Sequence, residues 1–373
     1  MVRGKTILVI GFVIMCFNSL YQYAWNALLP LFKSGFGVSL VEVELAFSLF
    51  TVFSTTFQIV GGSIADYRGP RLIGVISSLL SGIGFLGTSF SSSIYEFYTF
   101  WSLGSIGEGI LYGIAANLAV KWFPSKRGFA TGFVSLGFGL GSAIANPFIA
   151  SSSSFRAPTL VIGLVEIVIL PLLLYAIDYP KKVKGDRPTT VIRTVTWWLI
   201  YVSFSTSAVP LTVLSSSLSV LSPKDLLVLL VTVFPLLSGA SRPIIGYLSD
   251  SFGRVGTTSA VLFAMIIGST FFLLGLIVPS VVIIGFFGGS MITLFFALSG
   301  DIFGEKYSTA NNAILYTGKA LAGVLGSTVF SLLFLYNPLY AKVFVLANAV
   351  GGFILIVSVL LLSKRGKSSV GVH

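Results

Sequence analysis

Only one cysteine and one histidine occur in the 373 residues, Cys16 and the C-terminal His373. A single cysteine cannot form a disulfide within the chain, and it cannot build a site from several thiolates. Zinc centres and most nucleophile–base pairs of enzymes require several His or Cys side chains. The sequence therefore predicts no metal site, no catalytic residues and no cofactor, and it argues against most membrane enzymes.

Charged residues are also scarce, since Asp, Glu, Lys and Arg together make up 9% of the chain. Soluble domains carry about 25% of these residues. Hydrophobic residues instead make up 55% of the chain, and the mean hydropathy is +0.97. This composition predicts an all-α, polytopic membrane protein.

Twelve apolar runs are long enough to cross a bilayer as helices, which takes about 20 residues each. The first run is too long for a signal peptide, so we expect it to be a retained helix. The segment after the sixth run is polar, and its charges and prolines are typical of a linker. We therefore predict six N-terminal helices (1–178), a cytoplasmic linker (179–190) and six C-terminal helices (191–373). The predicted spans are 6–32, 41–65, 72–90, 94–120, 128–150, 157–177, 191–218, 225–248, 257–278, 281–302, 309–335 and 339–362.

Lys and Arg are distributed unevenly between the two sides of these spans. If the N-terminus is cytoplasmic, seventeen of the 23 basic residues lie on the cytoplasmic side and four on the other, with two in the membrane. Cytoplasmic loops carry the excess of basic residues, so we predict a plasma-membrane protein with both termini in the cytoplasm. This distribution explains the net charge of +11 without a nucleic-acid partner. The four outer residues are Lys33, Arg156, Lys224 and Lys342.

A short motif occurs twice, with its aspartates 184 residues apart, after the second and the eighth predicted spans. Its glycines allow a close helix approach and a tight turn, and its aspartate can meet a helix N-terminus and basic side chains. Such a cluster can act as a latch that holds one conformation; the alternative is a loop acid that balances nearby arginines. The latch residues are Gly62, Asp66 and Arg71 in the first copy and Gly246, Asp250 and Arg254 in the second.

The duplicated motif resembles the signature of the major facilitator superfamily, and further stretches resemble its oxalate/formate antiporter family, which is related to the monocarboxylate transporters. These stretches are 121–132 (KWFPSKRGFATG), 137–142 (GFGLGS), 21–25 (YQYAW), Arg242-Pro243 and 316–319 (YTGK). The resemblance implies twelve transmembrane helices in two pseudo-symmetric six-helix bundles, which rock about a midplane cavity. It also implies a monomer, and carboxylate binding by the two cations at Arg242 and Lys319.

The residues alone point to the same two cations. At ~1.5 Å per helical residue, Arg242 lies ~12 Å and Lys319 ~15 Å from the cytoplasmic ends of their spans. A cation at this depth costs at least ~2.5–3.5 kcal/mol and usually faces a partner or a cavity. Their half of the chain has no acid away from the span ends, so an anionic substrate fits. The alternative for Lys319 is a structural lysine that is neutralised nearby or reaches the interface.

Four further polar residues are predicted to surround the substrate: Gln22, Tyr23, Tyr112 and Tyr316. Their polar tips can orient a small acid while the rings form the wall; the alternative is packing between helices. Oxalate carriers of the resembling family place bulky aromatics in the tenth span, where this chain has Gly288 and Ile292. We therefore expect a roomier cavity, which favours a longer or more apolar monocarboxylate.

Two acids of the N-terminal half, Glu108 and Glu166, lie away from the span ends, and we expect them to be buried. We interpret Glu166 as a packing residue, because its helix is usually peripheral in this fold. Glu108 lies one turn from Tyr112 and is the proton-coupling candidate. It would neutralise Arg242 or Lys319 in the empty cavity and take up a proton when the anion binds, which gives symport. If Glu108 only bonds a neighbouring helix, the carrier is an exchanger.

These observations predict a secondary active transporter of small organic anions, mono- or dicarboxylates, that works by alternating access as an exchanger or a proton symporter. Its partners would be the carboxylate, a proton in the case of symport, and the lipid bilayer. A major facilitator drug or sugar porter is the main alternative. A membrane enzyme lacks a visible catalytic cluster, and a receptor would usually carry a signalling domain.

Overall fold

The computed structural model describes residues 2–123, 127–179, 188–303 and 308–368. This part of the chain is almost entirely helical and contains no strand, which confirms the predicted all-α class. The N-terminal helices are α1(Val2–Gln22), α2(Trp25–Phe36), α3(Leu40–Arg68), α4(Pro70–Phe90), α5(Ile94–Trp122), α6(Arg127–Ala150) and α7(Arg156–Tyr175). The C-terminal elements are η1(Pro188–Arg193), α8(Val195–Ser207), α9(Val209–Leu221), α10(Leu227–Phe252), α11(Arg254–Leu273), α12(Ile277–Phe303), α13(Ser308–Tyr316), α14(Gly318–Val324), η3(Leu325–Val329), α15(Phe330–Tyr336) and α16(Pro338–Ser368).

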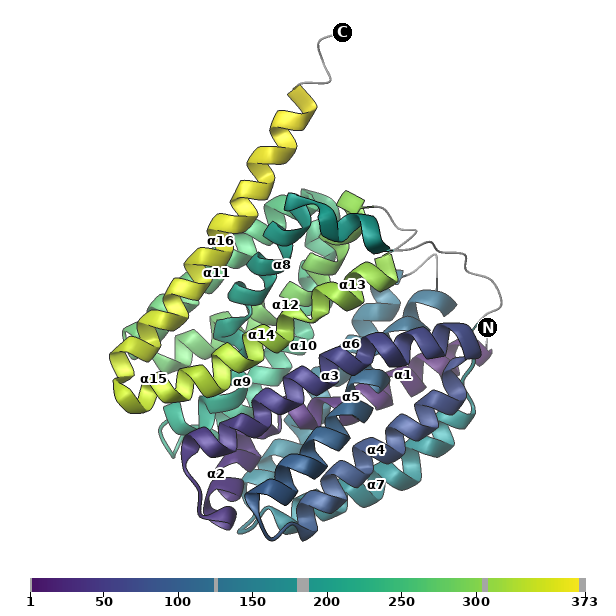
Figure 1. Cartoon of the computed structure of the whole chain (residues 1–373), viewed down its shortest axis with the longest axis vertical. Coiled ribbons are helices and arrows are strands. Elements are labelled where there is room, and N and C mark those ends of the chain that lie inside the picture. Colours follow the sequence, from purple (N-terminus) through teal and green to yellow (C-terminus); the bar gives the residue numbers. More distant parts are fainter. Residues whose placement is uncertain (1, 124–126, 180–187, 304–307, 369–373) are drawn as a thin grey trace.

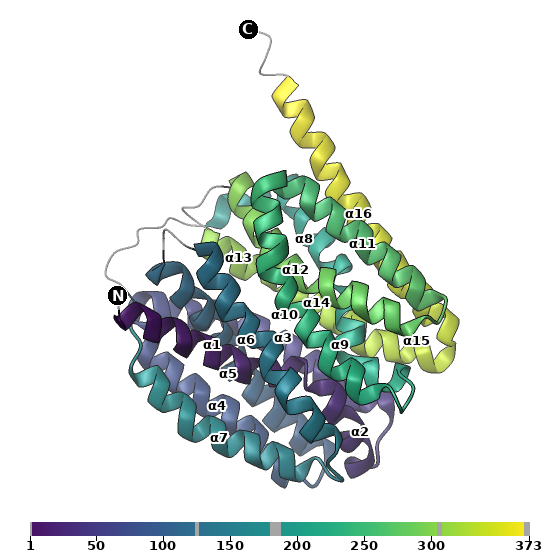
Figure 2. The ribbon, with the colours of Figure 1, turned by 180° about the vertical axis from the view of Figure 1, so that it is seen from behind.

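The helices lie in two groups that run side by side (Figure 1 and, from behind, Figure 2). Within the first group α4 packs on α5 and α7, and α3 packs on α5; within the second, α12 packs on α10 and α11, and α16 on α8. The groups meet mainly where α6 packs on α10, α3 on α14 and α2 on α9. The predicted linker falls largely on residues 180–187, outside the described part, so the domain boundaries stay a prediction.

In the residues that the structure describes, eleven helical stretches are long and apolar enough to span a membrane, which agrees with a polytopic membrane protein. The predicted span 94–120 corresponds to α5, which has 29 residues but is not among the eleven. Its sequence carries Glu96, Glu108 and Lys121. Of the twelve predicted spans, eleven are therefore matched by such a stretch.

Three predicted spans are broken helices rather than continuous ones. The first is interrupted after Gln22, where α1 ends and α2 begins. The seventh is interrupted at Ala208, beside Pro210 in the first turn of α9, where proline is tolerated because the amide has no intrahelical partner. The eleventh is divided into α13, α14, the π-helical η3 and α15. Breaks and π-turns in membrane helices are frequent at functional sites, and Lys319 lies just after one of these breaks.

Polar side chains connect the two groups at one end of the bundle, which we name the seam end, where α2, α9 and α15 lie; the N-terminus lies at the opposite end (Figure 1). Asn26 donates to the carbonyl oxygens of Leu214 (2.6 Å) and Ser215 (2.9 Å). The hydroxyls of Ser48 and Ser327 are 2.6 Å apart. These hydrogen bonds hold the two groups together at the seam end.

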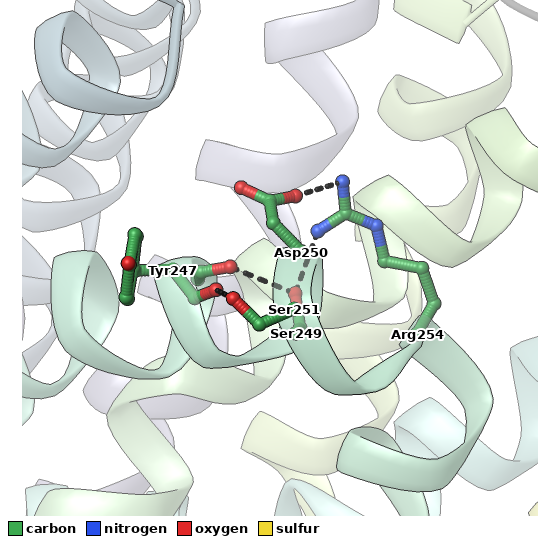
Figure 3. A network of polar contacts seen from close by, with 6 residues as sticks. Tyr247, Ser249, Asp250, Ser251 and Arg254 are labelled. Atoms are coloured by element: carbon green, nitrogen blue, oxygen red, sulfur yellow. Dashed lines mark hydrogen bonds and ion pairs between the residues drawn. The ribbon is translucent and has the colours of Figure 1, made fainter.

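The second copy of the repeated motif forms a compact polar network at the end of α10 (Figure 3). Arg254 makes an ion pair of 2.5 Å with Asp250 and donates to the Ser249 hydroxyl at 2.6 Å. The tight turn expected at the glycine before the arginine is confirmed, since Gly69 and Gly253 both have φ of 90°. That backbone conformation is strained for residues with a Cβ.

The close helix approach expected at Gly62 and Gly246 is wrong. A Cβ at Gly62 would meet nothing within 4 Å, and one at Gly246 would only touch Thr293 at 3.8 Å. In the first copy, the Arg71 guanidinium lies 5.3 Å from the centre of the Tyr175 ring. The Asp66 side chain is outside the described part of the structure, so the latch itself stays a prediction.

Candidate functional site

Arg242 is buried in the middle of α10, with 3% of its surface exposed. Its guanidinium carbon lies 5.2 Å from the centre of the Phe138 ring, which α6 contributes from the other helix group. The nearest groups that interact electrostatically with it are the hydroxyls of Tyr23, Tyr112 and Tyr316. No carboxylate pairs with it within the described residues, and its Nε atom has no hydrogen-bond partner. A buried guanidinium without a counter-ion is costly, and an anion that binds beside it would lower this cost.

Lys319 lies in the first turn of α14, directly after the helix break at Thr317. It is 4% exposed, and its Nζ donates to the Tyr316 hydroxyl at 3.0 Å. The same ammonium group lies 5.3 Å from the centre of the Phe50 ring, on α3. Such aromatic faces stabilise a desolvated cation without neutralising it. Lys319 is therefore held at the boundary between the two helix groups by a tyrosine hydroxyl and aromatic rings.

Three of the four predicted polar residues join these cations. The Tyr112 ring stacks on the Tyr316 ring, with centres 5.4 Å apart and planes 13° apart. The Tyr23 hydroxyl is 2.6 Å from the Ser238 hydroxyl, one turn before Arg242 on α10. Gln22 is buried as the last residue of α1, but in the described structure no hydrogen bond joins it to the cluster. The structure thus brings five of the six predicted substrate-contacting residues together.

Glu108 is fully buried in α5 and belongs to the same neighbourhood. Its Oε2 accepts a hydrogen bond of 2.5 Å from Ser54 of α3, while its Oε1 has no partner. It interacts electrostatically with Lys319, although no direct ion pair joins these two described side chains. Of the two buried cations, Glu108 therefore interacts with Lys319. Arg242 has no acidic partner among the described residues.

Comparison with known proteins identifies the family. The model of the Major Facilitator Superfamily matches residues 9–224, more than half of the chain. The chain belongs to the major facilitator superfamily. It is thus a multi-pass membrane transporter by family, and its helix arrangement agrees with that fold.

Relatives of this major facilitator protein include two with a named substrate. It is 30% identical to the oxalate:formate antiporter of Oxalobacter formigenes, over 86% of this chain and 82% of that protein. It is 28% identical to a probable sulfoacetate transporter of Cupriavidus necator, over 87% and 85% of the two chains. It is also 47% identical to an uncharacterized 38 kDa protein in the 23S RNA operon of Thermoproteus tenax, over 86% of each.

The aromatic rings that contact the two cations of this major facilitator protein were not predicted from the sequence. Phe50 and Phe138 lie on predicted spans, but nothing in a single sequence separates them from the other 31 phenylalanines. Ser54, whose hydroxyl holds Glu108, was not predicted either. The available signal was Gly109, a small residue that allows a neighbouring helix to approach closely. In the structure α3 and α5 pack so closely here that a Cβ at Gly109 would overlap the Ser54 backbone.

Gly288 does not open the space that we expected there, while the size of the cavity around Ile292 stays a prediction. A Cβ at Gly288 would lie 3.0 Å from Leu211 and 3.2 Å from Met265, so the space is filled by side chains of α9 and α11. Gly288 therefore serves helix packing and gives no reason to prefer a longer substrate. The packing role expected for Glu166 is confirmed, because it is fully buried and accepts a hydrogen bond from Ser81 of α4 at 2.8 Å.

Proposed function

We propose that this chain is a secondary active transporter of small organic anions, mono- or dicarboxylates, that works by alternating access in the plasma membrane. The observation that carries the proposal is Arg242, a buried guanidinium that faces three tyrosines and has no acidic partner among the described residues. A planar guanidinium can donate two parallel hydrogen bonds to one carboxylate. An arriving anion supplies the missing counter-charge.

The surrounding side chains suit a small, flat anion. Tyr112 and Tyr316 come from different helix groups and stack on each other, and Lys319 is bonded to Tyr316. Arg242 and Lys319 both belong to the C-terminal group, and Tyr112 of the N-terminal group interacts with Arg242. An anion at Arg242 that also reaches the Tyr112 hydroxyl would contact both groups at once, which is what alternating access requires. The names of two relatives, an oxalate:formate antiporter and a sulfoacetate transporter, denote organic anions and support this class.

The orientation follows from the charges in the loops. With the termini in the cytoplasm, the seam end faces outside, since Lys33 and Lys224 lie at that end and most other basic residues lie at the opposite end. The hydrogen bonds of Asn26 and Ser48 then close the extracellular side. The structure supports a state in which the anion site is shut off from the outside.

Glu108 offers a way for the transporter to change conformation without a bound substrate. In the absence of an anion, its carboxylate offsets part of the charge of Lys319 across the group boundary. When an anion takes that role, Glu108 loses its electrostatic partner and would bind a proton, because an unpaired carboxylate in a buried site is costly. Proton and anion then move in the same direction. If Glu108 stays bonded to Ser54 and ionised throughout, the carrier exchanges anions instead.

Uptake by purified protein in liposomes tests the proposed function. We expect labelled formate, oxalate, lactate or sulfoacetate to accumulate when the liposomes are preloaded with an unlabelled anion or given a pH gradient. Neutral sugars and cationic drugs should neither be taken up nor compete with the anion. Uptake of sugars or drugs at rates that carboxylates do not slow would overturn the proposal in favour of a sugar or drug porter.

A further inference from the structure

A further buried carboxyl, Glu44, lies at the seam end and has no role in the anion site. It belongs to the second turn of α3 and is fully buried. Its Oε1 accepts a hydrogen bond of 2.7 Å from Ser217 of α9, so the bond crosses from one helix group to the other. Its Oε2 has no partner. Ser54, which holds Glu108, lies ten residues further along α3, or about 15 Å.

Within the described part of the chain, the neighbours of Glu44 carry no compensating charge. The side chains that interact with it are Trp25 of α2 and Ser216 and Ser217 of α9, and all three are neutral. On α5, the nearby Tyr98 donates to the backbone oxygen of Glu42 rather than to this carboxyl. The described side chains of η3 that reach this part of α3, Ser327 and Thr328, bond to Ser48. The nearest buried cation, Lys319 of α14, lies over Phe50, about 9 Å further along the axis of α3.

An ionised carboxylate in this position would be buried with its Oε2 atom lacking a hydrogen-bond partner, which is costly. A neutral acid meets no such penalty, because Oε1 can accept from Ser217 while Oε2 carries the proton. When the two groups separate at the seam end, water reaches the carboxyl and stabilises its charge. The closed seam therefore binds one more proton than the open seam does.

We propose that Glu44 is a second proton-binding site, whose protonation is required for the extracellular seam to close. Lowering the pH then favours the closed seam, and raising the pH favours opening. Because one proton is involved, the ratio of open to closed molecules rises by at most tenfold per pH unit. Only the assignment of the seam end to the outside rests on the proposed function.

The test measures the seam directly and needs no substrate. Spin labels are attached at Ser34, on the exposed part of α2, and at Lys224, in the loop before α10, after Cys16→Ser. Their distance distribution is recorded in lipid nanodiscs between pH 5 and pH 9. We expect a long-distance population that grows as the pH rises and that is lost in Glu44→Gln, which stays closed throughout. A chain that transports another class of solute would still show this behaviour, so failure of the proposed function is distinguishable.

Two matched variants sharpen the test. Glu42→Gln removes an exposed carboxyl two residues away, and glutamine keeps the capping bond that Glu42 makes to the Ser39 amide; it should leave the pH response unchanged. Glu96→Gln removes an exposed carboxyl in the first turn of α5 and should also retain the response. A wild-type distance that does not change with pH, a response that persists in Glu44→Gln, or one that disappears in either matched variant would overturn the proposal.

Ser217→Ala separates the proton site from a purely structural contact. It removes the hydrogen bond across the seam and leaves the carboxyl in place. The open population should rise at every pH, while the dependence on pH remains. Loss of the pH dependence in Ser217→Ala would mean that the hydrogen bond itself is responsible, and would contradict the assignment to Glu44.

Discussion

Packing alone does not explain why an arginine is buried at position 242. Arg242 is buried, it makes no ion pair with a described residue, and its Nε atom has no hydrogen-bond partner. Lys319 differs, since it has both a tyrosine hydroxyl and an electrostatic partner in Glu108. The two cations are therefore not equivalent. If the proposed function is right, we expect Arg242 to depend on the anion for its counter-charge, and Lys319 to interact with both the anion and Glu108.

Arg242→Lys keeps the positive charge and removes the planar fork. Charged hydrogen bonds contribute about 1.5–3 kcal/mol each, so the loss of one should lower anion uptake by roughly 10- to 100-fold. The measurement is initial uptake of a labelled carboxylate into proteoliposomes. Arg193→Lys, at an exposed arginine in η1, is the control and should retain wild-type uptake. Wild-type uptake in Arg242→Lys would rule out a bidentate contact.

Lys319→Gln should weaken anion transport while the protein still folds, because glutamine keeps a donor for Tyr316 but has no charge. The expected result is reduced uptake with an unchanged melting temperature. Lys224→Gln, in an exposed loop, serves as the control. A Lys319→Gln variant with full uptake would show that Lys319 is a structural lysine.

Glu108→Gln distinguishes symport from exchange. With symport, accumulation driven by a pH gradient should disappear, while exchange of one anion for another survives. The glutamine amide can still accept a hydrogen bond from Ser54, but it cannot bind and release a proton. Counterflow and gradient-driven uptake are measured in the same proteoliposomes. Glu96→Gln, at an exposed site on α5, is the matched control. If accumulation driven by the gradient persists in Glu108→Gln, another residue couples the proton.

At the scale of elements, the broken eleventh span connects the anion site to the seam. α14 begins beside Lys319, and the π-helical η3 follows it and places Ser327 opposite Ser48 of α3. Small residues permit this close contact: a Cβ at Gly323 would overlap the Thr51 side chain of α3. Movement of Lys319 toward an anion would therefore be transmitted through α14 to the hydrogen bonds that close the seam.

Gly323→Ala should force α14 away from α3 and open the seam. Overpacking of this kind costs about 1–3 kcal/mol, which increases the open population roughly 5- to 150-fold. The spin labels at Ser34 and Lys224 report it as a longer distance at a fixed pH. Gly351→Ala is the control, because a Cβ there meets nothing within 4 Å. An unchanged distance in Gly323→Ala would show that this contact does not hold the seam closed.

At the scale of the whole molecule, the structure has its seam closed, and the repeated motif lies at the other end of the bundle. Asp250 pairs with Arg254 of the next helix, and both are partly exposed. This ion pair lies within the C-terminal group and does not join the two groups. In the closed-seam state, the second copy of the motif is therefore a local contact, which is consistent with a latch that engages in the opposite state.

Asp66→Asn tests that latch. If Asp66 stabilises the outward-open state from the cytoplasmic side, its loss should increase the closed-seam population, seen as a shorter distance between labels at Ser34 and Lys224 at high pH. Glu96→Gln, which removes an exposed carboxyl elsewhere, should have no effect. Equal distributions in Asp66→Asn and the wild type, together with equal turnover, would refute the latch.

The sequence determined the class of the protein and the location of its buried charges. Long apolar runs must be helical in a bilayer, since every backbone amide and carbonyl has to be satisfied within its own segment. A cation such as Arg242 or Lys319 stands out against that background because its burial is costly. Neither inference requires knowledge of which helices touch.

The tertiary structure alone decided which partner each charge has. Glu108 faces Lys319 rather than Arg242, Gly288 packs on Leu211 and Met265, and Glu44 meets Ser217 of the other group. These contacts join residues that are more than 20 positions apart in the sequence. They depend on the rotation and depth of each helix against its neighbours, which the packing of all the helices sets together. A periodic apolar sequence leaves both of these unspecified, and for this reason the acid at the seam was recognised only in the folded molecule.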